Sequence, residues 1–180
     1  MKTTANSTSF PAPVGGLNDR DSIAEMPASD AVILDNWRPY PSYLGVRKGT
    51  SNHVTGIPAT VETLVEYLPV SGNSTLFAAA GSSIYNVTSA GAVGAAVQSG
   101  LSNARFQAAN ITTPGGSFLY LVNGVDKPRL WDGATWVSVD GVSAPAITGV
   151  ATTLLVHVQL FKNRLFFVEK DSMRVWYLPT

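Results

Sequence analysis

The stretch FLYLVNGVDKPRLWDG, residues 118–133, predicts a β-hairpin: an apolar run with aromatics crosses a turn and returns to end at an aromatic. Leu, Val, Phe and Tyr favour strands, and Asn-Gly favours the turn. The pattern recurs in TLFAAAGSSIYNV, residues 75–87, and in RLFFVEKDSMRVWYL, residues 164–178. The return aromatics Tyr85, Trp131 and Trp176 lie roughly 45 residues apart, a blade-sized repeat period. The chain is therefore expected to be an array of β-modules.

Each hairpin is flanked by further strand-like runs. One precedes each hairpin, in residues 62–70, 104–112 and 153–161, and a short run follows the first two, AVGAAV from Ala92 and TWVSV from Thr135. Four antiparallel strands per repeat make the blade of a β-propeller. The sequence therefore predicts an all-β fold: a β-propeller-like array of four-stranded blades, incomplete in this chain, with an N-terminal arm. A sandwich or barrel whose strands recur is the alternative, because no WD or kelch signature is present.

The third module stops at Thr180, after its third strand. Propellers typically close with about four to eight blades. We therefore expect either a piece of a longer protein or an array that does not close into a propeller.

Turn chemistry locates the hairpins more closely. We expect turns at Gly81-Ser82, Asn123-Gly124 and Lys170-Asp171, and a two-residue type I′ turn at Asp132-Gly133 with Trp131 and Trp136 packed beside it. The strands should contribute alternate residues to the core between modules, namely Leu76, Phe77, Leu119, Leu121, Leu165 and Phe167.

Composition restricts the class of protein. With 45% hydrophobic and 13% charged residues, the chain is too apolar for disorder. Its formal net charge of +0 gives no basic face of the kind that nucleic-acid or anionic-membrane binding usually requires. The opening residues lack the apolar region of an ordinary export signal, and no apolar run reaches membrane-spanning length, so we expect neither export by such a signal nor a membrane span.

Catalytic and metal-binding patterns are missing from the sequence. The absence of Cys excludes disulfides and thiolate metal sites. His53 has no acid at motif spacing, and His157 belongs to an alternating run typical of a strand face. No nucleophile elbow, P-loop or HExxH motif occurs. We expect no enzyme activity, no catalytic residues, no cofactor and no metal.

Residues 1–58 form the expected N-terminal arm and interface segment, and residues 59–180 form the expected propeller blades. The arm groups five of the twelve acids of the chain and then three cations: Asp19, Asp21, Glu25, Asp30, Asp35, followed by Arg38, Arg47 and Lys48. One short helix is possible after Asp19 or Asp21 and must end before Pro27. A second is possible from Ser29 or Asp30 across AVILDNW, although AVIL fits a strand equally well.

The arm also carries more apolar side chains than a free linker should. The candidate interface residues are Leu17, Val32, Ile33, Leu34, Trp37, Tyr40 and Arg47. An apolar patch of that extent should be covered by the blades or by a neighbouring copy. AVILD from Ala31 is a candidate closing strand for the last blade. The acids of the arm would then face its cations, within the chain or across a subunit boundary, and set register more than affinity.

The arm resembles a known family. Residues 15–50, GGLNDRDSIAEMPASDAVILDNWRPYPSYLGVRKGT, contain a double glycine, an Asp-Ala pair, an apolar run into Asp-Asn-Trp, and then a glycine and a basic pair. This pattern is similar to the opening of the tail nozzle and head-to-tail stabilisation (tail tubular) proteins of short-tailed bacteriophages. In that family the opening leads into blades of a β-propeller.

The resemblance implies a structural virion protein. Such a protein would form a homo-oligomeric ring, a hexamer, that contacts portal, adaptor and other tail proteins and extends the portal channel. It would retain packaged DNA and conduct it during ejection, with transient, non-specific passage of double-stranded DNA and no membrane contact. It would lie in the tail of the virion and be assembled in the host cytoplasm. Two alternatives remain open: a carbohydrate-binding propeller adhesin, and a scaffold propeller that displays loops to protein partners.

Overall fold

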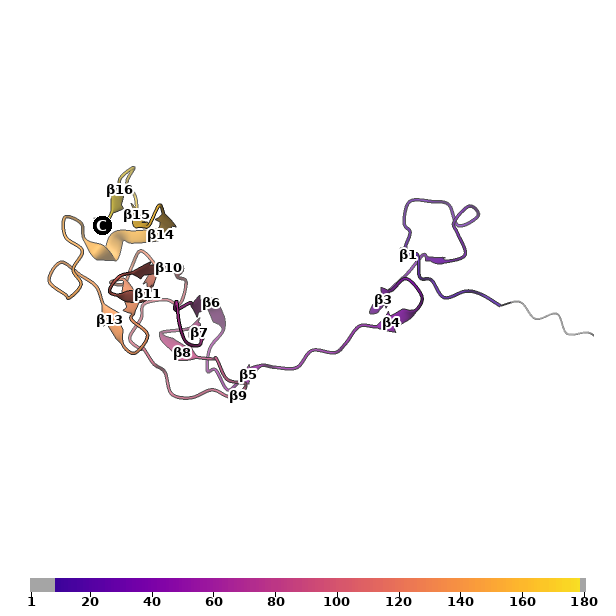
Figure 1. Cartoon of the computed structure of the whole chain (residues 1–180), viewed down its shortest axis with the longest axis horizontal. Coiled ribbons are helices and arrows are strands. Elements are labelled where there is room, and N and C mark those ends of the chain that lie inside the picture. The colour runs from indigo at the N-terminus through magenta and orange to yellow at the C-terminus, as the bar shows by residue number, and fades with distance from the viewer. Residues whose placement is uncertain (1–8, 179–180) are drawn as a thin grey trace, which may run out of the picture. The chain divides into compact units, whose positions relative to one another are not determined.

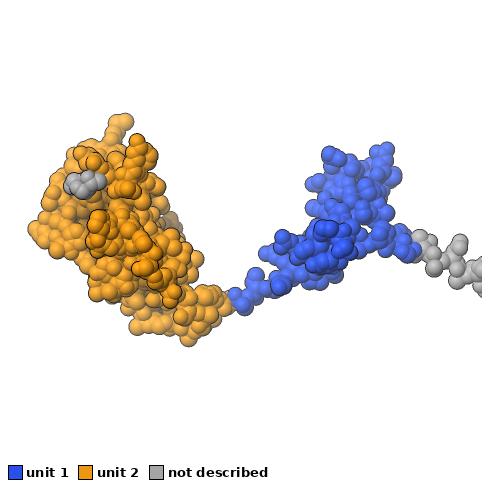
Figure 2. Space-filling view, in the orientation of Figure 1, with its two compact units in different colours: residues 1–51 blue, residues 52–180 orange. Residues whose placement is uncertain are grey.

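The computed structural model describes residues 9–178 and divides into two compact units, which meet in sequence between Ser51 and Asn52 (Figure 2). Both units are built of β-strands (Figure 1). Within the described residues, the one helical element is a short 3-10 turn, η1 (Thr152–Leu154). No helix in residues 9–178 is long and apolar enough to cross a membrane. The predicted all-β class is confirmed.

Unit 1 contains two small two-stranded sheets. In the first, β1 (Gly16–Leu17) pairs in parallel with β2 (Asp30–Ala31). In the second, β3 (Trp37–Pro39) pairs with the antiparallel strand β4 (Leu44–Val46). Of the AVILD segment, only Ala31 is in a strand, and it pairs with Leu17 in a sheet of two strands. Within this chain, AVILD is therefore not a strand of a repeat sheet.

The two short helices considered for the arm are wrong. Residues 22–26 make a single turn, in which the amides of Glu25 and Met26 both donate to the Ser22 carbonyl at 2.9 Å. Pro27 prevents its extension, and a helix of one turn gains too few hydrogen bonds to offset its nucleation cost. Residues 32–35 are not helical either, and Asn36 has a φ of 62°, in the left-handed region.

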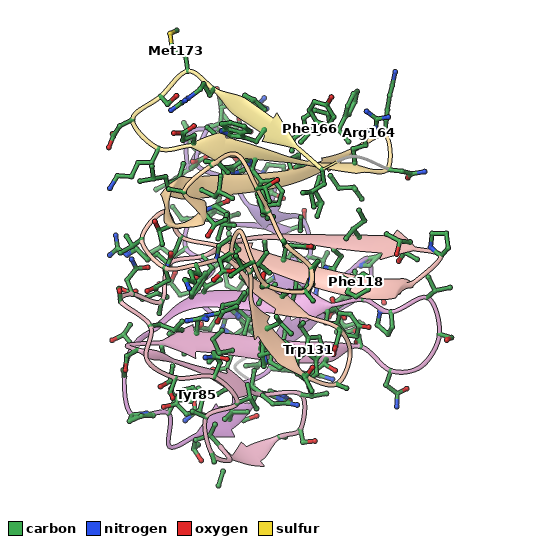
Figure 3. All side chains as sticks on the ribbon, turned by 90° about the vertical axis from the view of Figure 1, so that its left-hand side faces the viewer. Tyr85, Phe118, Trp131, Arg164, Phe166 and Met173 are labelled. Atoms are coloured by element: carbon green, nitrogen blue, oxygen red, sulfur yellow. The ribbon has the colours of Figure 1, made fainter. Side chains whose placement is uncertain are left out.

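Unit 2 contains three consecutive antiparallel meanders. We call them the first, second and third repeat sheets, and Figure 3 shows them one above another, with Tyr85 in the first, Phe118 in the second and Phe166 in the third. The first is β6 (Val61–Tyr67), β7 (Thr75–Ala80) and β8 (Ser83–Asn86); the second is β10 (Gln107–Thr113), β11 (Gly116–Val122), β12 (Arg129–Trp131) and β13 (Trp136–Ser138); the third is β14 (Leu155–Phe161), β15 (Arg164–Glu169) and β16 (Val175–Tyr177).

The three repeat hairpins form where the sequence predicts them. Gly81-Ser82 makes a two-residue turn, since Ala80 pairs with Ser83, and Gly81 has a φ of 59°. Such a turn needs positive φ, which glycine adopts without a steric cost. Asn123-Gly124 begins the turn from β11 to β12, and Lys170-Asp171 begins the turn from β15 to β16.

Asp132-Gly133 is not the two-residue type I′ turn that we predicted. Trp131 pairs with Trp136, so four residues form the loop. The Asp132 carboxylate accepts hydrogen bonds from the amides of Ala134 and Thr135 at 2.8 and 2.6 Å, which stabilises the longer loop. Trp131 and Trp136 do pack beside it, with ring centroids 5.3 Å apart.

The fourth strand expected in the first module is also wrong. The start of that run, β9 (Gly91–Ala92), pairs in parallel with β5 (Val54–Thr55) instead of extending the sheet. Only the end of the run reaches the edge strand β8, where the Val97 amide donates to the Ile84 carbonyl at 2.8 Å and Ile84 forms a bridge with Gln98. Small residues dominate AVGAAV and provide little side-chain surface to hold a strand against β8.

Two apolar cores lie between consecutive repeat sheets. Phe77, Leu119 and Leu121 are fully buried between the first and second sheets. Leu165 and Phe167 are buried between the second and third, against Tyr120 and Leu130. These positions confirm the predicted alternation. Leu76 is the exception, because it is partly buried on the opposite face of the first sheet, beside Val54, Ile57 and Val93.

Candidate interface

Unit 1 is held together by a tight crossing of β1 and β2. The Gly15 amide donates to the Ser29 carbonyl at 2.8 Å, and the Asn18 amide donates to the Ala31 carbonyl at 2.9 Å. A Cβ at Gly15 would collide with the Asp30 carboxylate, so a larger residue there would require the Asp30 side chain to move. That carboxylate accepts a hydrogen bond from the Asn18 side-chain amide at 2.9 Å.

The β3–β4 hairpin has two chemically different faces. Because Trp37 pairs with Val46 and Arg38 pairs with Gly45, side chains alternate between the faces. Trp37, Pro39, Leu44 and Val46 form the apolar face. Arg38, Tyr40, Gly45 and Arg47, with the adjacent Lys48, form what we call the cationic face.

The predicted interface residues all lie in unit 1, and most are accessible within it. Leu17 is 59% exposed, Val32 52%, Ile33 76% and Trp37 47%. Arg47 is also exposed, whereas Leu34 and Tyr40 are half-buried. Leu17 follows the glycine pair on β1, Val32 to Leu34 follow β2, and the remaining three are in or beside the hairpin, so β1–β2 and β3–β4 bring them into one unit.

The expected pairing of acids with cations inside the arm is not seen in the described residues. Asp21 accepts from its neighbour Arg20 at 3.3 Å and from Asn18. Within residues 9–178, no carboxylate lies within ion-pair distance of Arg38, Arg47 or Lys48. Pairing across a subunit boundary stays a prediction.

A second exposed apolar surface, which the sequence analysis did not identify, is the outer face of the third repeat sheet. We call this the open face, and it contains Phe161, Phe166 and Tyr177, with Val168 and Val175 beside them. The ring centroids of Phe161 and Phe166 are 6.2 Å apart, and those of Phe166 and Tyr177 are 6.1 Å apart. Tyr177 is 57% exposed and Phe161 59%. Lys162 and Arg164 lie over the Phe161 and Tyr177 rings at 5.5 and 5.6 Å. Figure 3 shows Arg164 and Phe166 on this last sheet.

The open face has an equivalent in the second sheet, and that equivalent is covered. There, the pair Tyr120 and Leu130 occupies the place of the pair Phe166 and Tyr177. Tyr120 and Leu130 are 5% and 2% exposed because the third sheet covers them. The continuous apolar run of β15, residues 165–168, is a signal that both faces of this strand are built for packing.

Unit 2 also has a cavity of about 480 Å³ between the second and third sheets, lined by Ile111, Thr112, Thr113, Pro114, Phe118, Tyr120, Leu130, Pro145, Asn163, Arg164, Leu165 and Leu178. This lining holds no carboxylate and no imidazole, so it offers no general acid–base pair. His53 contacts the Val87 carbonyl through Nε2 at 3.0 Å, and His157 lies in β14. Among the described residues, no three His, Asp or Glu side chains are grouped closely enough to hold a metal ion.

Comparison with known proteins identifies no relative: no family model, no curated protein and no solved structure matches this chain. Its function is therefore inferred from its residues and its fold.

Proposed function

We propose that this protein is a non-enzymatic structural component of a phage tail, a ring-forming nozzle or head-to-tail protein that extends the portal channel. In this proposal the repeat sheets are blades of a β-propeller, and unit 1 carries the contacts between copies. The ring retains packaged DNA and conducts it during ejection.

The observation that carries the proposal is the array of three antiparallel meanders packed face to face. Each buried core lies between one sheet and the next in sequence. This is the packing expected of successive propeller blades. The open face of the third sheet supports it too, since such a face should receive a further sheet.

The accessible apolar side chains of unit 1 support a role in assembly. Exposed apolar groups concentrated in a small unit are costly in water unless another surface covers them. Leu17, Val32, Ile33 and Trp37 supply such groups. A heterologous contact made by this unit would form a ring if the rotation between copies closes.

Electron microscopy of the purified chain in negative stain tests the proposal. We expect rings with a central channel, and six copies per ring from mass photometry. Single compact particles at every protein concentration, combined with specific binding to a capsular polysaccharide on a glycan array, would reject the ring and favour a carbohydrate-binding propeller.

A further inference from the structure

The cationic face of the β3–β4 hairpin surrounds a hollow. The hollow has a volume of about 560 Å³ and is lined by Arg38, Tyr40, Tyr43, Gly45, Val46, Arg47 and Lys48. Gly45 is opposite Arg38 in the hairpin, and the rings of Tyr40 and Tyr43 lie 3.1 and 3.5 Å from the position of a Cβ at Gly45. No acid is part of this lining, so three positive charges meet around one open space.

The aromatic side chains beside the hollow hold part of it in place. The rings of Tyr40 and Tyr43 stack with centroids 4.5 Å apart and an interplanar angle of 13°. The Arg38 guanidinium lies over the Tyr40 ring at 5.6 Å. Stacking on an aromatic ring restrains an arginine while leaving its N–H donors available to an acceptor.

The cations of this hairpin belong to the cations of the chain that have no carboxylate partner among the described residues, as do Lys162 and Arg164. Arg20, Arg105, Lys127 and Arg174 each have a carboxylate within 3.5 Å. Arg38, Arg47 and Lys48 have none among the described residues, although five acids belong to the same unit. The hairpin therefore presents a small basic face, which the net charge of +0 gave no reason to expect.

We propose that the cationic face binds the phosphodiester backbone of double-stranded DNA. Arginine and lysine donors recognise phosphate oxygens without reading sequence, and each neutralised phosphate releases condensed counterions. The assignment of phosphate follows from the face itself, and the choice of DNA as its source rests on the proposed function. Three contacts per chain give weak binding, which suits a molecule that must slide through a channel.

The placement of apolar residues favours DNA over an anionic membrane. A membrane-binding segment needs its basic and apolar side chains oriented for the same interface. Here Trp37, which is 47% exposed, lies on the face opposite to Arg38, and Val46 is the one aliphatic side chain that borders the hollow. Besides its three cations, the hollow is bordered by two tyrosines, Gly45 and Val46.

The test is binding of a fluorescent duplex of random sequence to the full chain, followed by anisotropy at several salt concentrations. Three phosphate contacts predict a slope of about −2.7 in log Kobs against log salt, which is a loss of about 40-fold in affinity between 50 and 200 mM salt. Arg47→Gln should lower that loss to about 12-fold, since one contact is removed. Arg20→Gln is the matched control, because Arg20 is in the same unit but is paired with Asp21.

Two results would overturn the proposal. One is that the wild type does not bind the duplex at low salt, and the other is that Arg47→Gln and Arg20→Gln change the slope equally. A preference of the wild type for vesicles with anionic lipids over the duplex, lost in Arg47→Gln, would assign the face to a membrane instead. Light scattering on the same samples separates the two proposals. Rings that do not bind DNA would contradict this inference and would still agree with the proposed function.

Discussion

Gly15 is the residue in unit 1 whose identity is most tightly constrained. A Cβ at this position would collide with the Asp30 carboxylate and lie 3.0 Å from the Ser29 carbonyl oxygen. The same carboxylate holds Asn18, whose side-chain oxygen accepts from the amides of Arg20 and Asp21. One added methyl group would therefore disturb the whole crossing of β1 and β2.

We predict that Gly15→Ala destabilises unit 1 by about 1 kcal/mol, because the Asp30 carboxylate must move and gives up its hydrogen bond from Asn18. Hydrogen exchange should show faster exchange at the amides of Asn18 and Gly15, both of which are bonded across the crossing. Gly49→Ala is the control, because nothing lies within 4 Å of a Cβ there. Equal protection in both variants would mean that Asp30 moves aside at no cost.

We expect Asp140 to contribute to the acid sensitivity of the fold. Its carboxylate accepts from Lys127 Nζ at 2.8 Å and from the amides of Val142 and Ser143 at 2.9 and 2.8 Å. The hydrogen bond from Lys127, and then those from the two amides, lower the pKa of Asp140 from 3.8 to about 2. Hydrogen bonds also lower the pKa of Asp126 and of Asp132, in the neighbouring loops of the same sheet, although burial opposes the shift at both.

Because the folded-state pKa of Asp140 is lowered, its contribution to stability is complete above about pH 4 and is lost as the pH falls towards 2. We predict that the urea midpoint of the wild type declines over this window and that Asp140→Asn declines less steeply. Asp19→Asn serves as the control, since the Asp19 carboxylate makes no hydrogen bond among residues 9–178. Parallel wild-type and Asp140→Asn curves would contradict the prediction.

At the scale of elements, Phe166 and Phe167 are a natural matched pair. They are consecutive in β15 and identical in type, but Phe167 is 1% exposed in the core against the second sheet, while Phe166 belongs to the open face. Phe167→Ala should cost about 3–5 kcal/mol, because it leaves a cavity in a closed core. Phe166→Ala should cost about 1 kcal/mol, because its ring already contacts water on one side.

Chemical denaturation of the two variants, at a protein concentration where the chain is monomeric, measures this difference. Similar losses would mean that another surface covers Phe166 in the monomer. A larger loss for Phe166→Ala that appears only at high concentration would instead show that a partner surface occupies the open face.

The elements most accessible to sequence analysis were the hairpins, because alternation and turn chemistry act over neighbouring residues. The failures have identifiable causes. Asp132-Gly133 satisfied the pattern of a two-residue turn, but the Asp132 carboxylate caps the amides of a four-residue loop. Apolar and polar residues alternate only weakly in residues 92–97. The first of these residues, in β9, pairs instead with β5, a strand some 35 residues earlier whose pairing no local pattern reveals. The two helices considered for the arm do not form, because Pro27 prevents extension of the first and the β1–β2 crossing occupies the start of the second.

The candidate interface was only partly predictable, because it also depends on strand pairings that no local pattern reveals. Apolar excess in a linker-like segment identified residues such as Ile33 and Trp37, which are indeed exposed in unit 1. The division of the hairpin into an apolar and a cationic face depends on the pairing of Arg38 with Gly45, which required the structure. The open face could not be predicted because strands with apolar residues on both sides look alike whether or not a neighbour covers them.

At the scale of the whole molecule, folding and assembly should be separable. The three buried clusters draw all their residues from the part of the chain after Ser51, from Val54 to Leu178. Unit 1 contributes none of them, while it carries exposed Leu17, Val32, Ile33 and Trp37. The sheets of unit 2 therefore need no side chain of unit 1 for their cores.

We predict that a chain lacking residues 1–51 keeps the wild-type unfolding transition of unit 2 but no longer forms the ring. The reason is that deletion removes the proposed contact surface and leaves the sheet cores intact. Circular dichroism during heating reports the first quantity, and multi-angle light scattering reports the second. Ile33→Asp in the full chain is the finer version, since Ile33 is 76% exposed and its replacement costs unit 1 little packing. A truncated chain that still assembles would move the subunit contact from unit 1 to unit 2, where the open face is the next surface to mutate.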